Sequence, residues 1–506
     1  MRIAVVGGGI SGLAAAHRLR TLLPDAAIVV LEQRDRLGGV LRTIDLAGMP
    51  FDVGAEAFLA RRPEVPALLA ELGLAGELVH PGVAKATVRA GGVTVPLPGG
   101  TVLGVPTSGA RLDDVLSPPG VAAADAEPDR PLRWEQGGDV VLGPLLRSRF
   151  GNELADRLVD PLLGGVYAGR VDALGLRATL PGLAAALDAG APSLTAAADR
   201  ATAPSSASCA SAHGELRVPG RRVAHLGTAS SAFTYGGGPG PSGDEAPVDG
   251  APPVFGALRG GYAVLVAALT AAFAAQVRLS TTVTGLERRR EGWRLLLAAG
   301  DIPHGLLDVD AVVLAVPAPA TARLLADVSS VAARSLGQIE LASSVVIAMA
   351  YREADTAGLP TTSGVLVAAD EPTSIKAATH SSRKWPHLGP AKDGIVRLRV
   401  SLGRFGEAAA LQVDDAELVA RARADLAVLC DITAAPLAVH VQRWGGGLPQ
   451  YAVGHLDRVR AVDAGVAELP GFAVAGAALH GVGVPACVGT ARAAAERVAA
   501  QVAVAR

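Results

Sequence analysis

Hydrophobic and polar residues follow a strand, helix and strand pattern over the first 33 residues of the chain. Residues 2–6 (RIAVV) are a short apolar run, residues 11–22 carry apolar side chains at helical spacing, and residues 26–33 (AAIVVLEQ) are rich in β-branched residues. Short apolar runs predict buried strands, and the spacing between them predicts a helix. A strand, a glycine-rich turn, a helix and a second strand within about 30 residues are typical of the βαβ unit of a doubly wound sheet.

Similar patterns continue through the second half of the chain. Within residues 255–273, two glycines precede a predicted helix. Residues 277–297 predict a strand, a turn and a strand. Residues 310–325 predict a buried strand that leads into a helix. Residues 343–400 alternate as in an antiparallel sheet. Residues 471–502 again predict a strand, a glycine-rich turn and a long helix. Because the two ends share one pattern, we expect a nucleotide-binding domain assembled from discontinuous segments.

Three segments in the first half differ from this pattern. Residues 149–170 predict an amphipathic helix followed by a glycine-rich turn. Residues 186–253 are rich in Ser, Ala, Gly and Pro and show little periodicity. Such a composition cannot bury enough apolar surface to offset the loss of chain entropy, so we expect a mobile insertion there. Residues 117–131 predict a shorter loop of the same kind.

The composition narrows the class of protein. Of the 506 residues, 50% are hydrophobic and 19% are charged, which is typical of a globular chain with more than one domain. A formal net charge of −2 gives no global field that would attract nucleic acid or an anionic membrane. Cys209, Cys430 and Cys487 are far apart, so we expect a reducing compartment, no disulfide framework and no metal. Without a signal-peptide pattern or an apolar run of about 18 residues, we expect a cytoplasmic protein without a transmembrane segment.

The first glycine-rich turn has the spacing of a dinucleotide-binding motif. Gly7 permits a tight turn, Gly9 permits close approach of a pyrophosphate, and Gly12 permits close packing of the helix on the sheet. The helix N-terminus would direct N–H groups at the phosphates. Glu32 follows Gly12 by 20 residues, where a carboxylate accepts hydrogen bonds from ribose hydroxyls. The alternative is a glycine-rich turn that binds nothing.

The next segment favours FAD over NAD. Residues 32–43 (EQRDRLGGVLRT) contain a second glycine pair directly after the second predicted strand. Such an extension suits a ligand that reaches deep into the protein, as a flavin dinucleotide does. A simple NAD dehydrogenase usually continues into a helix at this point.

The motifs quoted so far resemble the amine oxidase and protoporphyrinogen oxidase superfamily of FAD enzymes. Five further blocks resemble the porphyrinogen oxidase branch of that superfamily, in its soluble, actinobacterial-like type. These blocks are residues 51–63 (FDVGAEAFLARRP), 158–169 (LVDPLLGGVYAG), 374–386 (SIKAATHSSRKWP), 443–455 (RWGGGLPQYAVGH) and 476–498 (GAALHGVGVPACVGTARAAAERV). The resemblance covers the whole chain except residues 186–253.

The resemblance implies a set of FAD contacts along the chain. They are Gly7, Gly8, Gly9, Ile10, Ser11 and Gly12 for the pyrophosphate, Glu32 and Gln33 for the adenosine ribose, Val283 for the adenine through its backbone, Gly39, Val40, Gly54, Ala55, Glu56 and Ala57 for the flavin end, and Trp444, Val482, Gly483 and Val484 for the isoalloxazine. A helix that begins at the last of these turns would direct N–H donors at the flavin N1–C2=O, where reduction builds negative charge. The alternative role for Trp444 is that of a core aromatic residue.

We therefore expect an α/β fold in which a Rossmann-like FAD-binding domain accompanies a mixed or antiparallel substrate-binding sheet and a helical subdomain. The expected boundaries are 1–85, 255–318 and 435–506 for the FAD-binding domain, 86–185 for the helical subdomain around the substrate cavity, 186–253 for the insertion and 319–434 for the sheet domain.

The resemblance also implies a reaction, in which the flavin takes hydrides from a porphyrinogen and molecular oxygen reoxidises it to give peroxide. It implies no catalytic acid or base, because pyrrole N–H protons can leave to solvent. Coproporphyrinogen III, with four propionates, is favoured over protoporphyrinogen IX, with two, because the chain has no apolar membrane-docking stretch. Four carboxylates suit basic residues at the pocket mouth. The candidates are Arg61, Arg62, Gly169, Arg170, Lys376 and Arg383, and the alternative for each charged one is a solvated surface charge.

Three other functions stay open on the same fold. Amine oxidases place a lysine near the flavin and an aromatic cage above it, whereas this chain has four lysines and 3% aromatic residues. At the cage position it has Ala478, Leu479 and His480. We expect His480 to be a buried, satisfied histidine, and the alternative is a ligand-facing group. A phytoene-desaturase-like enzyme and an FAD-binding scaffold without turnover are the further alternatives. The expected partners are a tetrapyrrole, molecular oxygen and a ferrochelatase that receives the product, with the chain acting as a monomer.

Overall fold

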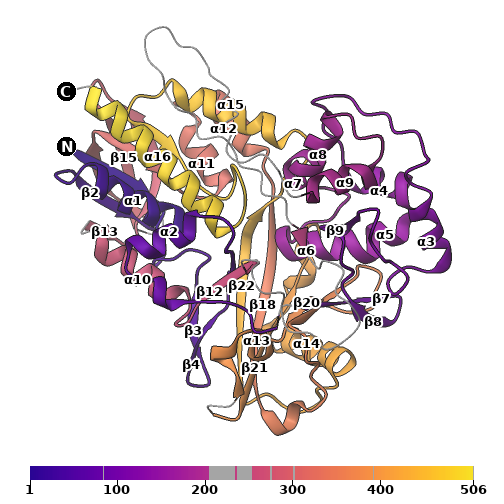
Figure 1. The fold of residues 1–506 in the computed structure, drawn as a ribbon. Helices are drawn as coiled ribbons and strands as arrows, with labels where there is room; N and C mark the ends of the chain where they lie inside the picture. Colours follow the sequence, from indigo (N-terminus) through magenta and orange to yellow (C-terminus); the bar gives the residue numbers. More distant parts are fainter. Residues whose placement is uncertain are drawn as a thin grey trace.

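A computed structural model of the chain describes residues 1–83, 85–203, 234–235, 253–273, 276–299, 302–390 and 393–504. It contains two main sheets and a group of helices, which are arranged side by side (Figure 1). The α/β class expected from the sequence is confirmed.

The first sheet is fully parallel and combines strands from the beginning, the middle and the end of the chain. Its order is β13 (Gln276–Arg278), β2 (Ala27–Leu31), β1 (Arg2–Val6), β17 (Ala311–Leu314) and β23 (Phe472–Val474). β1, β2, β17 and β23 were predicted from apolar runs, because a parallel strand is buried on both faces. The edge strand β13 (QVR) has no buried residue and was not predicted as a strand of this sheet. The discontinuous assembly of this sheet is therefore confirmed.

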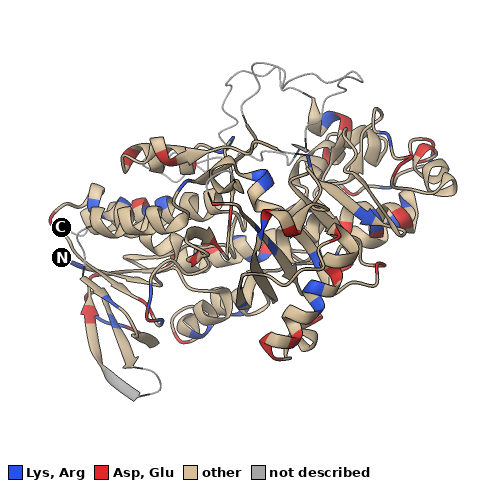
Figure 2. Cartoon of the chain, turned by 90° about the horizontal axis from the view of Figure 1, so that it is seen from below, with Lys and Arg blue, Asp and Glu red and all other residues tan. Residues whose placement is uncertain are grey.

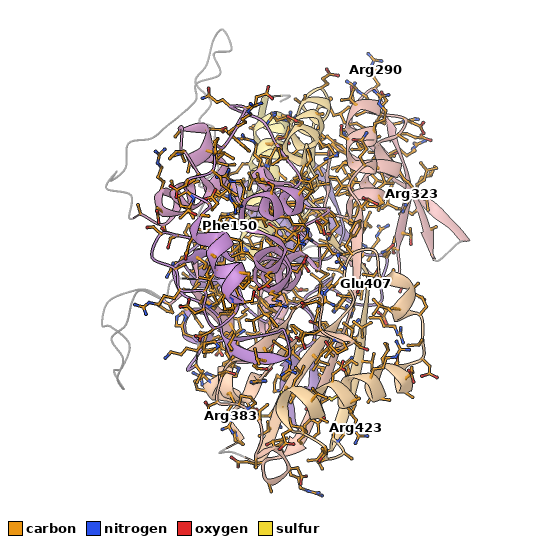
Figure 3. The ribbon with its side chains drawn as sticks, turned by 90° about the vertical axis from the view of Figure 1, so that its right-hand side faces the viewer. Phe150, Arg290, Arg323, Arg383, Glu407 and Arg423 are labelled. Carbon is orange, nitrogen blue, oxygen red and sulfur yellow. The ribbon has the colours of Figure 1, made fainter. Side chains whose placement is uncertain are left out.

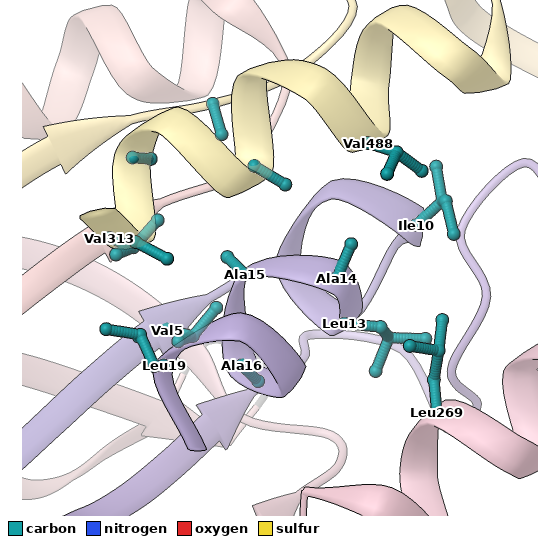
Figure 4. Close-up of a cluster of buried hydrophobic side chains, with 14 of the residues drawn as sticks. Val5, Ile10, Leu13, Ala14, Ala15, Ala16, Leu19, Leu269, Val313 and Val488 are labelled. Atoms are coloured by element: carbon teal, nitrogen blue, oxygen red, sulfur yellow. The ribbon is translucent and has the colours of Figure 1, made fainter. Parts of the chain in front are cut away.

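Helices cover one face of the parallel sheet in a close layer. α1 (Ile10–Leu22) lies between α16 (Val484–Val504) and α10 (Tyr262–Ala272), as Figure 4 shows. Ala14, Ala15 and Ala16 are at most 2% exposed, and their small side chains permit this close approach. The two ends of the chain consequently lie next to each other (Figure 1).

The opposite face of the parallel sheet packs against a smaller antiparallel sheet and three helices. They are β14 (Thr282–Arg288), β15 (Trp293–Ala299), β16 (Ile302–Val309), α11 (Ala318–Leu325), α12 (Ser330–Gly337) and α15 (His455–Ala467). Short elements complete this part of the molecule. They are β3 (Thr43–Leu46), β4 (Met49–Asp52), β5 (Phe58–Leu59), α2 (Glu64–Glu71), β6 (Leu78–Val79), β12 (Phe255–Leu258) and α13 (Ser381–Lys384).

The second main sheet has seven strands. Its order is β22 (Ala438–Pro449), β18 (Leu341–Arg352), β21 (Ile395–Leu402), β20 (Ile375–Thr379), β19 (Gly364–Val367), β7 (Thr87–Ala90) and β8 (Val93–Pro96). Neighbouring strands are antiparallel except β19 and β7, so the antiparallel sheet expected within 343–400 is confirmed. One face packs against α14 (Asp415–Cys430), and the other contacts α6 (Asp160–Tyr167).

The sheet extends beyond the boundaries that the sequence predicted. β7 and β8 fall within 86–185, the expected helical subdomain, and β22 falls within 435–506, the expected third segment of the FAD-binding domain. These strands pair with partners far away in the sequence, and local periodicity does not report such pairing.

The remaining helices form a separate group, shown in magenta in Figure 1. They are α3 (Pro118–Asp125), α4 (Leu142–Phe150), α5 (Asn152–Leu154), α6, α7 (Leu176–Thr179), α8 (Pro181–Asp188) and α9 (Leu194–Thr202), with a π-helical turn, Ala155–Val159, between α5 and α6. β9 (Thr101–Val102), β10 (Val105–Pro106) and β11 (Thr234–Tyr235) pair beside them. The helix predicted within 149–170 is confirmed.

Two predicted loops are wrong. Residues 117–131 contain α3, and the start of the predicted insertion contains the last residues of α8 and all of α9. Glu127 explains this order, because its fully buried carboxylate pairs with Arg149 at 2.6 Å and accepts hydrogen bonds from the N–H groups of Leu194 and Thr195. The rest of the predicted insertion, 204–233 and 236–252, lies outside the described residues.

Charges of both signs are interspersed along the ribbon (Figure 2). In the part of the chain that the structure describes, no helix has the length and apolarity needed to cross a membrane. The same part contains no group of three or more His, Cys, Asp or Glu residues arranged to hold a metal ion.

Candidate functional site

The turn between β1 and α1 requires glycine for two different reasons. A Cβ at Gly7, where φ is +106°, would lie 2.4 Å from the Ala315 carbonyl oxygen, and a Cβ at Gly12 would lie 1.8 Å from the Gly7 oxygen. Both glycines therefore serve the packing of the turn itself. Gly9 differs, because its Cβ would meet only Gly39, whose Cα lies 3.8 Å away. The space beside Gly9 thus opens toward the second glycine turn.

That second turn is fixed against the first. The N–H of Gly38 donates to the Gly8 oxygen at 2.8 Å, and Gly39 has a φ of +60°. A Cβ on Gly39 would come within 3.0 Å of the Gly9 Cα. The two turns therefore form a cradle that side chains would fill, and this geometry fits the pyrophosphate of a dinucleotide.

Two helices begin next to this cradle and the segment that follows it. α1 starts at Ile10, has no acidic residue in its first turn and has no side-chain cap at Gly9. α16 starts at Val484 and also lacks an acidic residue in its first turn. Helix N-termini carry unpaired N–H groups and a partial positive charge, which suit an anion or a polarised carbonyl. The arrangement is thus compatible with the predicted roles of residues 10–12 and 482–484.

The predicted adenosine end contains Glu32 and its neighbours. Glu32 is 7% exposed, and its Oε2 accepts the Gly8 N–H at 2.7 Å while its Oε1 accepts the Arg34 N–H at 2.9 Å. Each carboxylate oxygen has a further lone pair, which can accept a ribose hydroxyl. Gln33 is exposed beside it. The Glu32 backbone oxygen accepts the N–H of Thr281, so Val283, two residues later in β14, lies in the same region.

The predicted flavin end lies where the segment around the β3–β4 hairpin contacts the second main sheet. A Cβ on Gly54 would lie 1.8 Å from the Val40 oxygen and 3.2 Å from the Trp444 ring. Trp444, on β22, is 7% exposed and donates its Nε1–H to the Val53 oxygen at 2.9 Å. Val40 is 43% exposed although its side chain is apolar. The structure therefore brings together Val40, Gly54 and Trp444 from three distant parts of the sequence.

Gly481 and Val482 belong to the turn that precedes α16. The Gly481 N–H donates to the Tyr451 Oη at 2.8 Å, and that hydroxyl donates to the Ala477 oxygen at 2.6 Å. Val482 packs against the cluster of the magenta helices. The turn before α16 is thus held by fixed contacts. His480 is exposed, so the prediction of a buried histidine is wrong, because the side chain points outward just before the turn and lies 3.9 Å from Asp463.

The side chain of Glu56 is engaged in a buried ionic cluster. It pairs with Arg399 at 2.8 Å and with Lys384 at 3.4 Å, and it accepts the Trp385 Nε1–H. Burial opposes its ionisation, but Lys384 and Arg399 outweigh burial and lower the pKa of Glu56 to about 2. Any contact of Glu56 with a flavin would therefore use its backbone, as would contacts of its neighbours Ala55 and Ala57.

The sequence analysis missed the partners of Glu56. Arg399 also donates to the Gly54 oxygen at 2.8 Å, so it fixes the predicted flavin end from the second sheet. Its signal in the sequence is the alternation of β21 (IVRLRVSL), which places Arg397 and Arg399 on one face and apolar residues on the other.

The candidate substrate residues lie in several different parts of the structure. Arg61 is exposed between β5 and α2, and its neighbour Arg62 pairs with Glu64. Arg170 pairs with Glu407 at 3.4 Å. Lys376 is only 7% exposed; burial lowers its pKa, and the charge of the same Glu407 acts in the opposite direction. Gly169 faces the side chain of Gln450, whose Oε1 a Cβ would approach to 2.6 Å. Arg383 lies in α13, the helix that also contains Lys384. The structure thus brings Arg170 and Lys376 together, while Arg61 lies elsewhere on the surface.

Comparison with protein families identifies this arrangement. The model of the flavin-containing amine oxidoreductases matches residues 10–499. The chain belongs to this family. It is an FAD-dependent oxidoreductase, as the two glycine turns indicated.

Individual relatives give a finer comparison. The chain is 41% identical to the coproporphyrinogen III oxidase of Mycobacterium leprae, over 99% of this chain and 98% of that protein. It is 27% identical to the protoporphyrinogen oxidase of Bos taurus, over 98% of both chains. A crystal structure from Exiguobacterium sp. 255-15 aligns with a TM-score of 0.79 and 29% identity, over 99% of this chain and 98% of that one.

Proposed function

We propose that this chain oxidises coproporphyrinogen III to coproporphyrin III in heme biosynthesis, with molecular oxygen as the acceptor. Six hydrogens leave the porphyrinogen, and three oxygen molecules become three molecules of hydrogen peroxide. The observation that carries the proposal is the 41% identity, over nearly the whole chain, to a relative named for this substrate. Identity to the relative named for protoporphyrinogen is lower, at 27%, so protoporphyrinogen IX is the second candidate.

FAD supplies a hydride acceptor to this reaction when it is bound. The protein contributes binding and orientation. The two glycine turns would hold the pyrophosphate, Glu32 would accept the ribose hydroxyls, and the backbone around Gly54 would support the flavin end. Hydrogen bonds from Trp444 to the Val53 oxygen and from Arg399 to the Gly54 oxygen fix that support to the second sheet.

The geometry favours a porphyrinogen over an amine. At the position expected for an aromatic cage the chain has Ala478, Leu479 and the exposed His480. Lys384 is committed to Glu56 and stacks over the Trp385 ring at 4.9 Å, which removes it as a lysine beside the flavin. A cytoplasmic monomer that passes its product to a ferrochelatase remains part of the proposal.

Anaerobic mixing of the FAD-loaded protein with each substrate tests the proposal. We expect coproporphyrinogen III to bleach the flavin faster than protoporphyrinogen IX does. Equal or reversed rates would overturn the choice of substrate. Bleaching by amines would favour an amine oxidase, and a yellow protein that no porphyrinogen bleaches would favour a scaffold without turnover.

A further inference from the structure

A cluster of charged residues lies where the helical group meets the second sheet. Lys376 comes from β20, Arg404 and Glu407 follow β21, Arg170 follows α6, and Asp160 begins α6. Figure 3 labels Glu407, which lies beside the magenta helices. The backbone joins the two parts at this place, because the Phe405 N–H donates to the Ala168 oxygen at 2.7 Å.

The members of this cluster differ in how well they are paired. Glu407 lies 3.4 Å from the Arg170 guanidinium, and its other oxygen accepts the Arg404 N–H at 3.3 Å. Arg404 also donates to the Val367 oxygen at 3.0 Å. In the described part of the chain, Lys376 has neither a hydrogen bond nor an ion pair, although it is 7% exposed. The small exposed part of the Lys376 side chain includes its ammonium group.

The charges of the cluster do not balance. Three cations, Lys376, Arg404 and Arg170, face two carboxyl groups, Glu407 and Asp160. Burial raises the pKa of Asp160 from its usual value. Burial first, and Arg404 second, lower the pKa of Lys376 to about 7. When all five groups are ionised, the cluster is one negative charge short, and a buried cation without a counter-ion is unfavourable.

The position of Lys376 relates the cluster to the predicted flavin end. Thr379 of β20 pairs with Arg399 of β21, the residue that donates to the Gly54 oxygen. Lys376 precedes Thr379 by three residues, which is roughly 10 Å along an extended strand. α6 contacts β20 on the face of the sheet that also holds Leu366, opposite the face packed on α14. β20 thus connects the charged cluster with the strand whose Arg399 reaches the predicted flavin end.

We propose that Lys376, supported by Arg404 and Arg170, binds one carboxylate of the substrate. A carboxylate supplies the missing negative charge, and the two guanidinium groups are suited to orient it. This inference rests on the proposed function, since a porphyrinogen carries its propionates at the rim of the macrocycle. It assigns Lys376 a role in substrate binding and none in the removal of hydrogen.

Steady-state kinetics of Lys376→Met, with coproporphyrinogen III and its uncharged tetramethyl ester in the same detergent solution, test the inference. Loss of a charge-assisted contact should raise KM for the acid about 10- to 100-fold, with a smaller effect on kcat. KM for the ester should not change. An unchanged KM for the acid, or an equal rise for the ester, would overturn the inference. Lys85→Met, at an exposed lysine, is the matched control and should behave as the unmodified protein.

A pH series with Lys376→Arg separates charge from shape. In the unmodified protein, KM for the acid should rise above about pH 7, because the lysine then loses its proton. Arginine stays protonated, so this variant should retain a low KM without that rise. The same pH dependence in both proteins would contradict the inference. If the unmodified protein itself shows no bleaching by coproporphyrinogen III, the proposed function fails and not the subsite alone.

Discussion

Gly9→Ala should separate the folding of the first glycine turn from its binding of FAD. Gly9 has φ −75° and ψ 179°, a conformation that alanine adopts readily, and its Cβ would meet no atom nearer than 3.8 Å. Because alanine restricts the unfolded chain more than glycine does, the apoprotein should be unchanged in stability or more stable by up to about 1 kcal/mol. The new methyl group, however, would occupy the space between the two glycine turns.

A pyrophosphate displaced from the N-terminus of α1 loses an interaction worth up to about 2 kcal/mol, which corresponds to a Kd for FAD about 30-fold higher. Thermal unfolding of the apoprotein and fluorescence titration with FAD measure the two effects separately. Gly12→Ala is the contrasting variant, because its Cβ would overlap the Gly7 oxygen at 1.8 Å and should destabilise the apoprotein itself. If Gly9→Ala bound FAD with unchanged affinity, the pyrophosphate would not lie between the two turns.

Three further variants test buried carboxyl groups of the fold. Glu127→Ala should destabilise the protein by about 3–5 kcal/mol in urea unfolding, since it leaves the buried Arg149 without its partner. Burial raises the pKa of Asp52 to about 7, so the folded protein holds a proton that the unfolded chain releases near pH 4. Stability should therefore fall as the pH rises from about 4 to 7, and Asp52→Asn should flatten this part of a pH series of urea unfolding curves. Glu32→Ala should cost about 1–3 kcal/mol in the same unfolding assay and weaken FAD binding in a titration, because the Gly8 N–H loses its acceptor.

Elements with a clear local pattern were predictable from the sequence. β1, α1, β2 and α16 each carry their own periodicity, and glycines mark the turns between them. The helix α3 was mistaken for a loop because its order depends on Glu127, which bonds to residues that follow about 67 positions later. Composition alone gives no indication of such a distant partner. The same reason explains the strands β7, β8 and β22, whose neighbours in the sheet are distant in the sequence.

The candidate site shows the same division. The roles expected of Gly7 and Gly12 follow from spacing, and the structure gives each a steric reason for having no side chain. The contacts of Glu56 did not follow from its motif, since Arg399 and Lys384 reach it from separate elements of the second half of the chain. A motif identifies which backbone approaches a ligand, whereas the partners of a buried charge depend on tertiary packing.

The contacts around residues 53 and 54 connect the predicted flavin end to the second sheet. Val53 lies in the segment that follows the second glycine turn, yet its carbonyl accepts a hydrogen bond from Trp444 of the second sheet, as the next carbonyl does from Arg399. Two side chains of the second sheet therefore hold consecutive carbonyls of the segment that we expect to support the flavin. These hydrogen bonds therefore set the distance between residues 53–54 and the second sheet. Lys376, the side chain that we assign to the substrate carboxylate, belongs to the same sheet, so the proposed cofactor support and the proposed substrate binding would both depend on this sheet.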